Sequence, residues 1–223
     1  MNFEQARFNM VEQQLRPGKV LDPDVLEVLF VVKREEFVPP ALRRLAFADT
    51  QIPLGGDEGA CMLAPRVEAH ALQALAMKKH ENVLEVGTGS GYMAALLGVH
   101  ADRVWTIEID PRLADTAREN LRRAGVTNVT VEVGNGLAGL PAHAPYDVIM
   151  VSGAVAATPR ALLEQLKPGG RLFAIEGKAP AMEAALYTRV GDAGGANEFR
   201  RVAVFETAVA PLRDAEPALA FVF

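Results

Sequence analysis

The spacing of apolar residues changes along the chain, beginning with a helical portion. In residues 3–16 and 23–33 the apolar positions recur at intervals of three and four, which is the period of an amphipathic helix. A Pro-Gly pair separates the two runs, and Asp22 followed by Pro23 is a typical helix start. The pattern therefore predicts two helices joined by a turn.

A long loop and a third helix follow this pair. Residues 47–65, FADTQIPLGGDEGACMLAP, are rich in glycine and bounded by proline, which is typical of an irregular segment. Helical spacing returns in residues 66–77. Because long irregular loops in compact domains are often functional, we expect this loop to lie beside a binding site.

From residue 82 onward, short apolar runs alternate with helical patterns. The runs are NVLEVG (82–87), DRVWTIEI (102–109), NVTVEVG (128–134), YDVIMVS (146–152) and GGRLFAIEG (169–177). Helical patterns near residues 91–99, 111–124 and 158–166 lie between most of them. This alternation predicts an α/β fold: a doubly wound, mostly parallel sheet with helices on both faces.

The end of the chain predicts an antiparallel edge to this sheet. Residues 184–191 and 199–209 are strand-like and are divided by a turn-rich segment, and residues 218–223, ALAFVF, predict a further strand. No repeat or low-complexity tract interrupts the chain. We therefore expect one domain, in which residues 1–80 form an N-terminal helical portion with the loop and residues 81–223 form the core.

Composition narrows the class of protein. The chain has 223 residues, half of them hydrophobic, a net charge of −5 and a single cysteine, Cys61. The length and the hydrophobic content fit one packed domain, and a single cysteine excludes an internal disulfide. The negative net charge gives no indication of nucleic-acid binding. The four histidines show no metal-ligand spacing, so we expect no metal site.

With no signal peptide and no run of about 18 apolar residues, we expect a soluble, cytoplasmic protein without membrane contact. Nothing in the sequence indicates its oligomeric state.

The stretch VLEVGTGSGY has the form of a cofactor-binding strand and turn. Gly87, Thr88, Gly89 and Gly91 form a GxGxG pattern, whereas a dinucleotide fingerprint needs glycine at the position of Tyr92. The acid before the turn, Glu85, disfavours an anionic pyrophosphate and favours a cationic cofactor. S-adenosylmethionine fits, because its sulfonium and amino groups suit an acidic site and its carboxylate can take the amides of the turn.

Two more segments complete the predicted cofactor site. Glu108 ends the second strand about 20 residues after the first glycine, where a carboxylate can accept both ribose hydroxyls, and Ile109 follows it. After the third strand, Asn135 and Gly136 form a bend that can contact the adenine edge, with Leu137 next to it. The alternatives are that Glu85 and Glu108 are surface acids at strand ends and that the Asn-Gly pair is only a turn.

The fourth strand ends in small residues. Ser152 and Gly153 follow its apolar run and leave room for a methyl acceptor beside the cofactor.

These segments together resemble the protein-L-isoaspartate O-methyltransferases. The resemblance rests on NMVEQQL, REEFVP, VLEVGTGSGY, TIEIDPRLADTARENL, PYDVIMVSGA and LLEQLKPGGRL, which cover most of the chain. The central segments fit many class I methyltransferases, whereas the first two narrow the match to this family or a close relative. The resemblance implies a Rossmann-like methyltransferase fold, S-adenosylmethionine as cofactor, and damaged proteins or peptides with isoaspartyl residues as acceptors.

The chain departs from the family pattern at two positions. In the loop before the third helix, where the family has GQTISAP, residues 59–65 read GACMLAP, so Leu63 replaces a serine and Cys61 a threonine. In the adenine-side bend, Asn135 replaces an aspartate. Asparagine keeps an acceptor oxygen, so we expect cofactor binding to weaken only modestly, on the order of 1 kcal/mol. We therefore assign Cys61, Leu63, Ser152 and Gly153 to the acceptor side.

The predicted reaction needs no general base. An isoaspartyl carboxylate is ionised near neutral pH, so catalysis depends on alignment and desolvation, and we assign no catalytic acid, base or nucleophile. Cys61 is either a structural thiol or a nucleophile, and Trp105 is either a core residue or a platform for adenine. The alternative functions are methylation of a different acceptor and non-catalytic binding of cofactor or peptide.

Overall fold

A seven-stranded sheet forms the centre of the computed structural model, which describes residues 2–55, 59–191 and 198–215. The strand order is β5-β4-β3-β6-β7-β8-β9, and a separate two-stranded sheet pairs β1 with β2. The large sheet contains β3 (Asn82–Val86), β4 (Arg103–Glu108), β5 (Val129–Val133), β6 (Tyr146–Val155), β7 (Leu166–Lys178), β8 (Ala181–Gly191) and β9 (Glu198–Thr207). The small sheet contains β1 (Ile52–Pro53) and β2 (Cys61–Met62).

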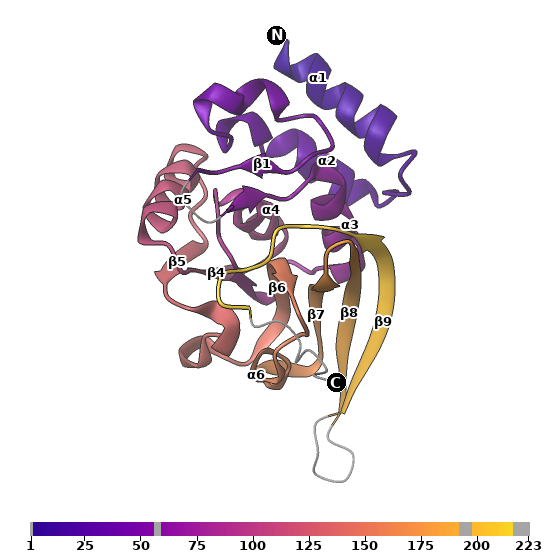
Figure 1. Ribbon diagram of the computed structural model, residues 1–223, viewed down its shortest axis with the longest axis vertical. Helices are drawn as coiled ribbons and strands as arrows, with labels where there is room; N and C mark the ends of the chain where they lie inside the picture. Colours follow the sequence, from indigo (N-terminus) through magenta and orange to yellow (C-terminus); the bar gives the residue numbers. More distant parts are fainter. Residues whose placement is uncertain (1, 56–58, 192–197, 216–223) are drawn as a thin grey trace, which may run out of the picture.

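Helices and short helical turns surround the sheet. The helices are α1 (Phe3–Met10), α2 (Pro23–Val31), α3 (Pro65–Leu75), α4 (Tyr92–His100), α5 (Pro111–Arg123) and α6 (Arg160–Glu164). A π-helical turn spans Val11–Leu15, and 3₁₀ turns span Arg34–Glu36, Pro40–Leu45, Gly136–Ala138 and Pro141–His143. Figure 1 shows α1 and α2 above the large sheet, whose strands β7, β8 and β9 run side by side below them. Within the described ranges, no helix is both long and apolar enough to cross a membrane.

The directions of the strands agree with the alternation in the sequence. β3 pairs in parallel with β4 and β6, β4 pairs in parallel with β5, and β6 pairs in parallel with β7. The last two pairs, β7 with β8 and β8 with β9, are antiparallel. The predicted doubly wound, mostly parallel sheet with an antiparallel C-terminal edge is therefore confirmed. The strand expected for residues 218–223 lies outside the described residues, as does most of the turn before β9.

Successive residues of β3 face opposite sides of the sheet, each covered by helices. Val83 packs in the hydrophobic cluster that includes residues of α2, α3 and α4, whereas Leu84 packs in the cluster that includes residues of α6. Because side chains alternate along a strand, Glu85 lies on the same side as Val83. Its carboxyl group therefore points toward the face covered by α3 and α4.

The first helices start as predicted but end differently. Asp22 accepts hydrogen bonds from the backbone nitrogens of Asp24 and Val25, at 2.9 and 3.2 Å, and so begins α2. The helix expected for residues 3–16 instead changes to a π-helical turn after Met10. Met10 and Leu15 are five residues apart and both fully buried, and a π-helical turn brings such a pair onto one face.

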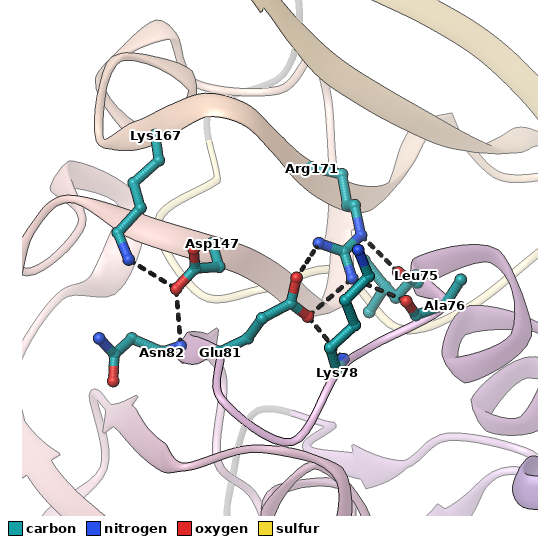
Figure 2. A network of polar contacts seen from close by, with 8 residues as sticks. All are labelled: Leu75, Ala76, Lys78, Glu81, Asn82, Asp147, Lys167 and Arg171. Carbon is teal, nitrogen blue, oxygen red and sulfur yellow. Dashed lines mark hydrogen bonds and ion pairs between the residues drawn. The ribbon is translucent and has the colours of Figure 1, made fainter.

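A polar network holds the amino ends of the central strands (Figure 2). Arg171 donates to the carbonyl oxygen of Leu75 at 2.5 Å and pairs with Glu81 at 2.7 Å. Asp147 accepts from the backbone nitrogen of Asn82 at 2.8 Å. These contacts fix the end of α3 to the start of β3. The carboxyl ends of the same strands carry the loops, which is where open α/β sheets bind ligands.

Candidate active site

The glycine turn after β3 has a backbone that other residues rarely adopt. Gly87, Gly89 and Gly91 have φ values of 91°, 52° and 83°, in the left-handed region. A Cβ atom on Gly91 would lie 3.3 Å from Cβ of Ala117, on α5. Gly91 therefore allows α4 and α5 to pack closely, and it lines neither of the two cavities described below.

An outer cavity lies over the carboxyl ends of β3, β4 and β6. It brings together seven of the predicted cofactor-binding residues. These are Gly87, Gly89, Glu108, Ile109, Asn135, Gly136 and Leu137. The predicted acceptor-side residues Cys61, Ser152 and Gly153 also line it. Five segments that are distant in the sequence thus meet at one end of the sheet.

An inner cavity of about 20 Å³ adjoins the outer one and shares part of its lining. Its walls include three further predicted site residues, Glu85, Thr88 and Leu63. They also include Glu68 and Tyr92, which are not among the residues predicted for the site. The inner cavity thus lies between the glycine turn and the loop that precedes α3.

Glu108 connects the outer cavity to the glycine turn. Its Oε2 accepts from the backbone nitrogen of Gly89 at 2.8 Å, and its Oε1 accepts from that of Asp110 at 3.0 Å. Each carboxylate oxygen can accept a further hydrogen bond. Glu108 is therefore able to hold the turn in place and bind a pair of hydroxyl groups at the same time.

Asn135 begins the 3₁₀ turn that follows β5. Its Oδ1 accepts from the backbone nitrogen of Leu137 at 3.0 Å, and its Nδ2 donates to Asp214 at 3.4 Å. The amide oxygen assigned to adenine from the sequence therefore already holds the turn. A second acceptor position on the same oxygen remains for an amino group.

Glu85 is fully buried between two hydroxyl donors. Its Oε1 accepts from Ser152 at 2.7 Å and its Oε2 from Thr106 at 2.6 Å. Burial raises the pKa of Glu85 to about 8, although both hydroxyl hydrogen bonds act in the opposite direction. The sequence suggests a fixed negative charge here, whereas burial favours the protonated, neutral form of this carboxyl group.

Replacing Glu85 by glutamine is expected to reduce the pH dependence of stability. The pKa of Glu85 rises from the ordinary 4.5 to about 8 on folding, so the folded protein binds this proton more tightly than the unfolded chain. Stability should therefore fall as the pH rises between these values. Thermal unfolding of the wild type and Glu85→Gln, compared at about pH 6 and about pH 8, measures the difference. Burial also raises the pKa of Glu68, to about 7, in both proteins, so only the difference between their slopes of stability against pH reports on Glu85. Equal slopes in the two proteins would contradict the raised pKa of Glu85.

Arg34, from the REEFVP motif, holds the backbone of the acceptor-side loop. Its guanidinium group is fully buried, and Nη1 forms an ion pair with Glu68. Nη2 donates to the carbonyl oxygen of Leu63 at 2.7 Å, and Nε to that of Ala46 at 2.9 Å. The motif that narrows the family resemblance thus fixes the loop in which the chain departs from the family.

Leu63 and Cys61 both lie beside the inner cavity. The side chain of Leu63 also belongs to the main hydrophobic cluster, so it is both a core residue and a wall of the cavity. The thiol of Cys61 donates to the carbonyl oxygen of Gly59 at 3.2 Å, and burial raises its pKa. These features favour the structural role for Cys61 over a nucleophilic one. In the described ranges, no group of three or more His, Cys, Asp or Glu residues could hold a metal ion.

His70 and Trp105 line neither cavity. Nε2 of His70 lies 2.9 Å from the carbonyl oxygen of Gly18, and its ring centroid is 5.0 Å from that of Phe205. Trp105 stacks on His143 with ring centroids 4.7 Å apart. The structure therefore favours the packing role for Trp105 over the adenine platform.

Residues 208–215 lie across the outer cavity, which was not predicted. Figure 1 shows this yellow segment turning back from β9 toward β6. Backbone hydrogen bonds of 3.0 and 2.8 Å join it to Ala154. Leu212 approaches so closely that a Cβ atom on Gly87 or Gly153 would lie 2.8 or 2.7 Å from its side chain. No local pattern indicates where a segment after the last strand will return, so the sequence gives no sign of this contact.

Glu68, in contrast, has a signature in the sequence. With Leu72 and Leu75 it follows the four-then-three spacing of one helix face, and all three residues are buried. An acid on the apolar face of a helix is unusual unless it is paired or functional. This pattern could have identified Glu68, whereas Tyr92 is noticed only as the residue that breaks the dinucleotide pattern.

Sequence comparison finds one matching family. The family model for protein-L-isoaspartate(D-aspartate) O-methyltransferase matches residues 5–196. A protein-L-isoaspartate O-methyltransferase from Methanoculleus marisnigri is 45% identical over 168 residues, which cover 75% of this chain and 76% of the relative. One from Rhodopseudomonas palustris is 38% identical over 208 residues and 93% of each chain.

Solved structures of such enzymes share the fold. A protein-L-isoaspartate O-methyltransferase aligns with a TM-score of 0.79 and 23% identity over 96% of this chain and 67% of its own. Another, from Plasmodium falciparum in complex with S-adenosyl-L-homocysteine, aligns with a TM-score of 0.78 and 18% identity over 96% of this chain and 99% of its own. At these identities the structures support the architecture alone.

Proposed function

The chain belongs to the protein-L-isoaspartate(D-aspartate) O-methyltransferase family, and we propose that its acceptor is the free carboxylate of isoaspartyl residues in damaged proteins or peptides. As a member of this family, it is an S-adenosylmethionine-dependent carboxyl O-methyltransferase. The observation that carries the proposal is the family match over residues 5–196, which includes both the loop before α3 and the glycine turn.

The residues around the outer cavity fit S-adenosylmethionine. Glu108 offers carboxylate oxygens for the ribose hydroxyls. The backbone nitrogens of Gly87, Gly89 and Gly91 already donate within the protein, so Thr88 and Ser90 are the residues of the turn whose amides could bind a carboxylate. A Cβ atom on Gly136 would lie 2.6 Å from side-chain atoms of Val86 and Ile107, so only glycine brings the backbone so close to the cavity floor. Glu85, which regains its charge when a cation approaches, suits the amino group of the cofactor.

The chain's own residues contribute alignment and exclusion of water. S-adenosylmethionine supplies an electrophilic methyl group bound to a sulfonium. Transfer of this methyl group to an acceptor carboxylate oxygen would break the carbon–sulfur bond, release S-adenosylhomocysteine and require no proton transfer. Four residues line both cavities and therefore have to position the acceptor and the cofactor in line: Cys61, Gly87, Gly89 and Ser152. No general base is needed for an acceptor that is already ionised.

Leu63 supports a second candidate, which is methylation of a different acceptor. Leucine cannot donate a hydrogen bond to a carboxylate, and its side chain forms part of the wall of the inner cavity. An uncharged acceptor would meet a smaller desolvation cost there.

Consumption of the cofactor separates these functions. Purified protein with S-adenosylmethionine is given aged protein, a peptide pool or a metabolite extract, and S-adenosylhomocysteine is measured. We expect product with aged protein and with peptides. Product with metabolites alone would indicate a different acceptor, and absence of product with aged protein and with peptides would contradict the proposed one.

A further inference from the structure

The hydroxyl group of Tyr92 is buried in the wall of the inner cavity. Tyr92 is 1% exposed, and its hydroxyl oxygen makes no hydrogen bond of acceptable geometry within the described residues, although the guanidinium group of Arg34 lies close to it. A buried hydroxyl group without a hydrogen bond is costly. We therefore expect a ligand or a water molecule to form a hydrogen bond with this hydroxyl group.

The ring of Tyr92 is held firmly on both sides. The guanidinium carbon of Arg34 lies 4.9 Å from the ring centroid, and the ring of Phe37 packs edge-on at 5.4 Å. Both contacts come from the segment that also holds the loop at Leu63. The hydroxyl group therefore keeps a fixed position relative to the cavity and the loop.

Most other hydroxyl groups around the inner cavity are already engaged. Ser152 donates to Glu85, and Thr88 shares a hydrogen bond of 2.6 Å with Thr106, which itself donates to Glu85. The oxygen of Ser90 accepts weakly, at 3.4 Å, from the backbone nitrogen of Tyr92. Ser90 therefore has a partner, and among the described hydroxyl groups that line the inner cavity Tyr92 is the one without a hydrogen bond of acceptable geometry.

The size and charge of the inner cavity fit one carboxylate oxygen. A volume of about 20 Å³ holds a single oxygen-sized group. Glu68 is paired with Arg34, and a charge on Glu85 would be balanced by the amino group of the bound cofactor, so neither acid presents an uncompensated charge to an anion there. Burial also raises the pKa of Tyr92, despite the opposing charge of Arg34, so the phenol remains a donor.

We propose that Tyr92 binds the acceptor, its hydroxyl group donating to the carboxylate oxygen that does not attack the methyl group. Tyr92 thereby supplies the hydrogen bond that Leu63 cannot supply. The inference rests on the proposed function, because it requires an acceptor carboxylate in the inner cavity.

Tyr92→Phe tests this role, because it removes the hydroxyl group and keeps the ring. We expect kcat/KM for a synthetic isoaspartyl peptide to fall about tenfold, with unchanged affinity for S-adenosylhomocysteine and a thermal midpoint that is equal or higher. A merely structural hydroxyl group would not combine lower activity with undiminished stability. Tyr146→Phe is the matched control and should leave kcat/KM unchanged, because the hydroxyl group of Tyr146 donates to the carbonyl oxygen of Leu140 at 2.7 Å and Tyr146 lines neither cavity. Leu63→Ser should recover more activity in the Tyr92→Phe background than in the wild type.

Two measurements distinguish failure of this inference from failure of the proposed function. If the wild type methylates the peptide and Tyr92→Phe does so equally well, the inference is wrong and the function stands. If the wild type does not methylate it, calorimetric binding of the peptide in the presence of S-adenosylhomocysteine becomes the test, and Tyr92→Phe should bind more weakly. Absence of both turnover and binding in the wild type would overturn the inference together with the function.

Discussion

Glu108→Ala is expected to weaken binding of S-adenosylhomocysteine by about 1.5 to 3 kcal/mol, the range for hydrogen bonds to a charged group. This corresponds to a roughly ten- to hundredfold higher Kd. The substitution removes an acceptor for ribose hydroxyls and also releases the backbone nitrogens of Gly89 and Asp110, so the glycine turn should loosen as well. Calorimetry measures the affinity, and NAD should show no binding to the wild type.

A neighbouring acid provides the control for this substitution. Glu132 lies on β5, in register with Ile107 on β4, and lines neither cavity. Glu132→Ala removes the same charge from the next strand and should leave the affinity unchanged. An unaltered affinity in Glu108→Ala, or equal losses in both variants, would remove Glu108 from the cofactor site.

Leu63→Ser, combined with Cys61→Thr, is expected to raise kcat/KM for an isoaspartyl peptide roughly ten- to a hundredfold. The serine hydroxyl would add a hydrogen bond to the acceptor carboxylate, typically worth about 1.5 to 3 kcal/mol when the acceptor is charged. The substitution should also destabilise the fold by about 2 to 5 kcal/mol, the range for truncating a buried leucine. Leu63 is 5% exposed and lies in the main hydrophobic cluster.

Leu63→Ala in the same Cys61→Thr background separates the hydroxyl group from the lost bulk. Both variants remove most of the leucine side chain and should lose similar stability, measured by thermal unfolding. Only the serine variant should gain activity. Equal activities in the two variants, or a wild type that already acts as fast as the serine variant, would show that residue 63 does not contact the acceptor.

The parts of the fold that depend on local pattern could be predicted from the sequence. The β3 run predicts a buried strand because its residues are apolar on both faces, and the glycines that follow predict a turn with unusual φ values. The position of Glu108 follows from the end of the next strand, since the carboxyl ends of parallel strands meet at one edge of the sheet.

Contacts between distant segments could not be predicted in this way. Arg34 and Glu68 are 34 residues apart, and their pairing depends on how α3 packs against the segment after α2. The approach of Leu212 to Gly87 depends on the path of the chain after β9. The raised pKa of Glu85 is likewise a property of burial, which identity and spacing do not reveal.

The most direct test of the central claim compares two synthetic peptides of identical sequence, one with an isoaspartyl and one with a normal aspartyl residue at the same position. The purified protein is incubated with each peptide and with S-adenosylmethionine labelled in its methyl group, at saturating cofactor, and base-labile methyl ester is counted. We predict label on the isoaspartyl peptide and none above background on its aspartyl partner. Equal labelling of the two peptides, or labelling of neither, would contradict the assignment of the isoaspartyl carboxylate as the acceptor.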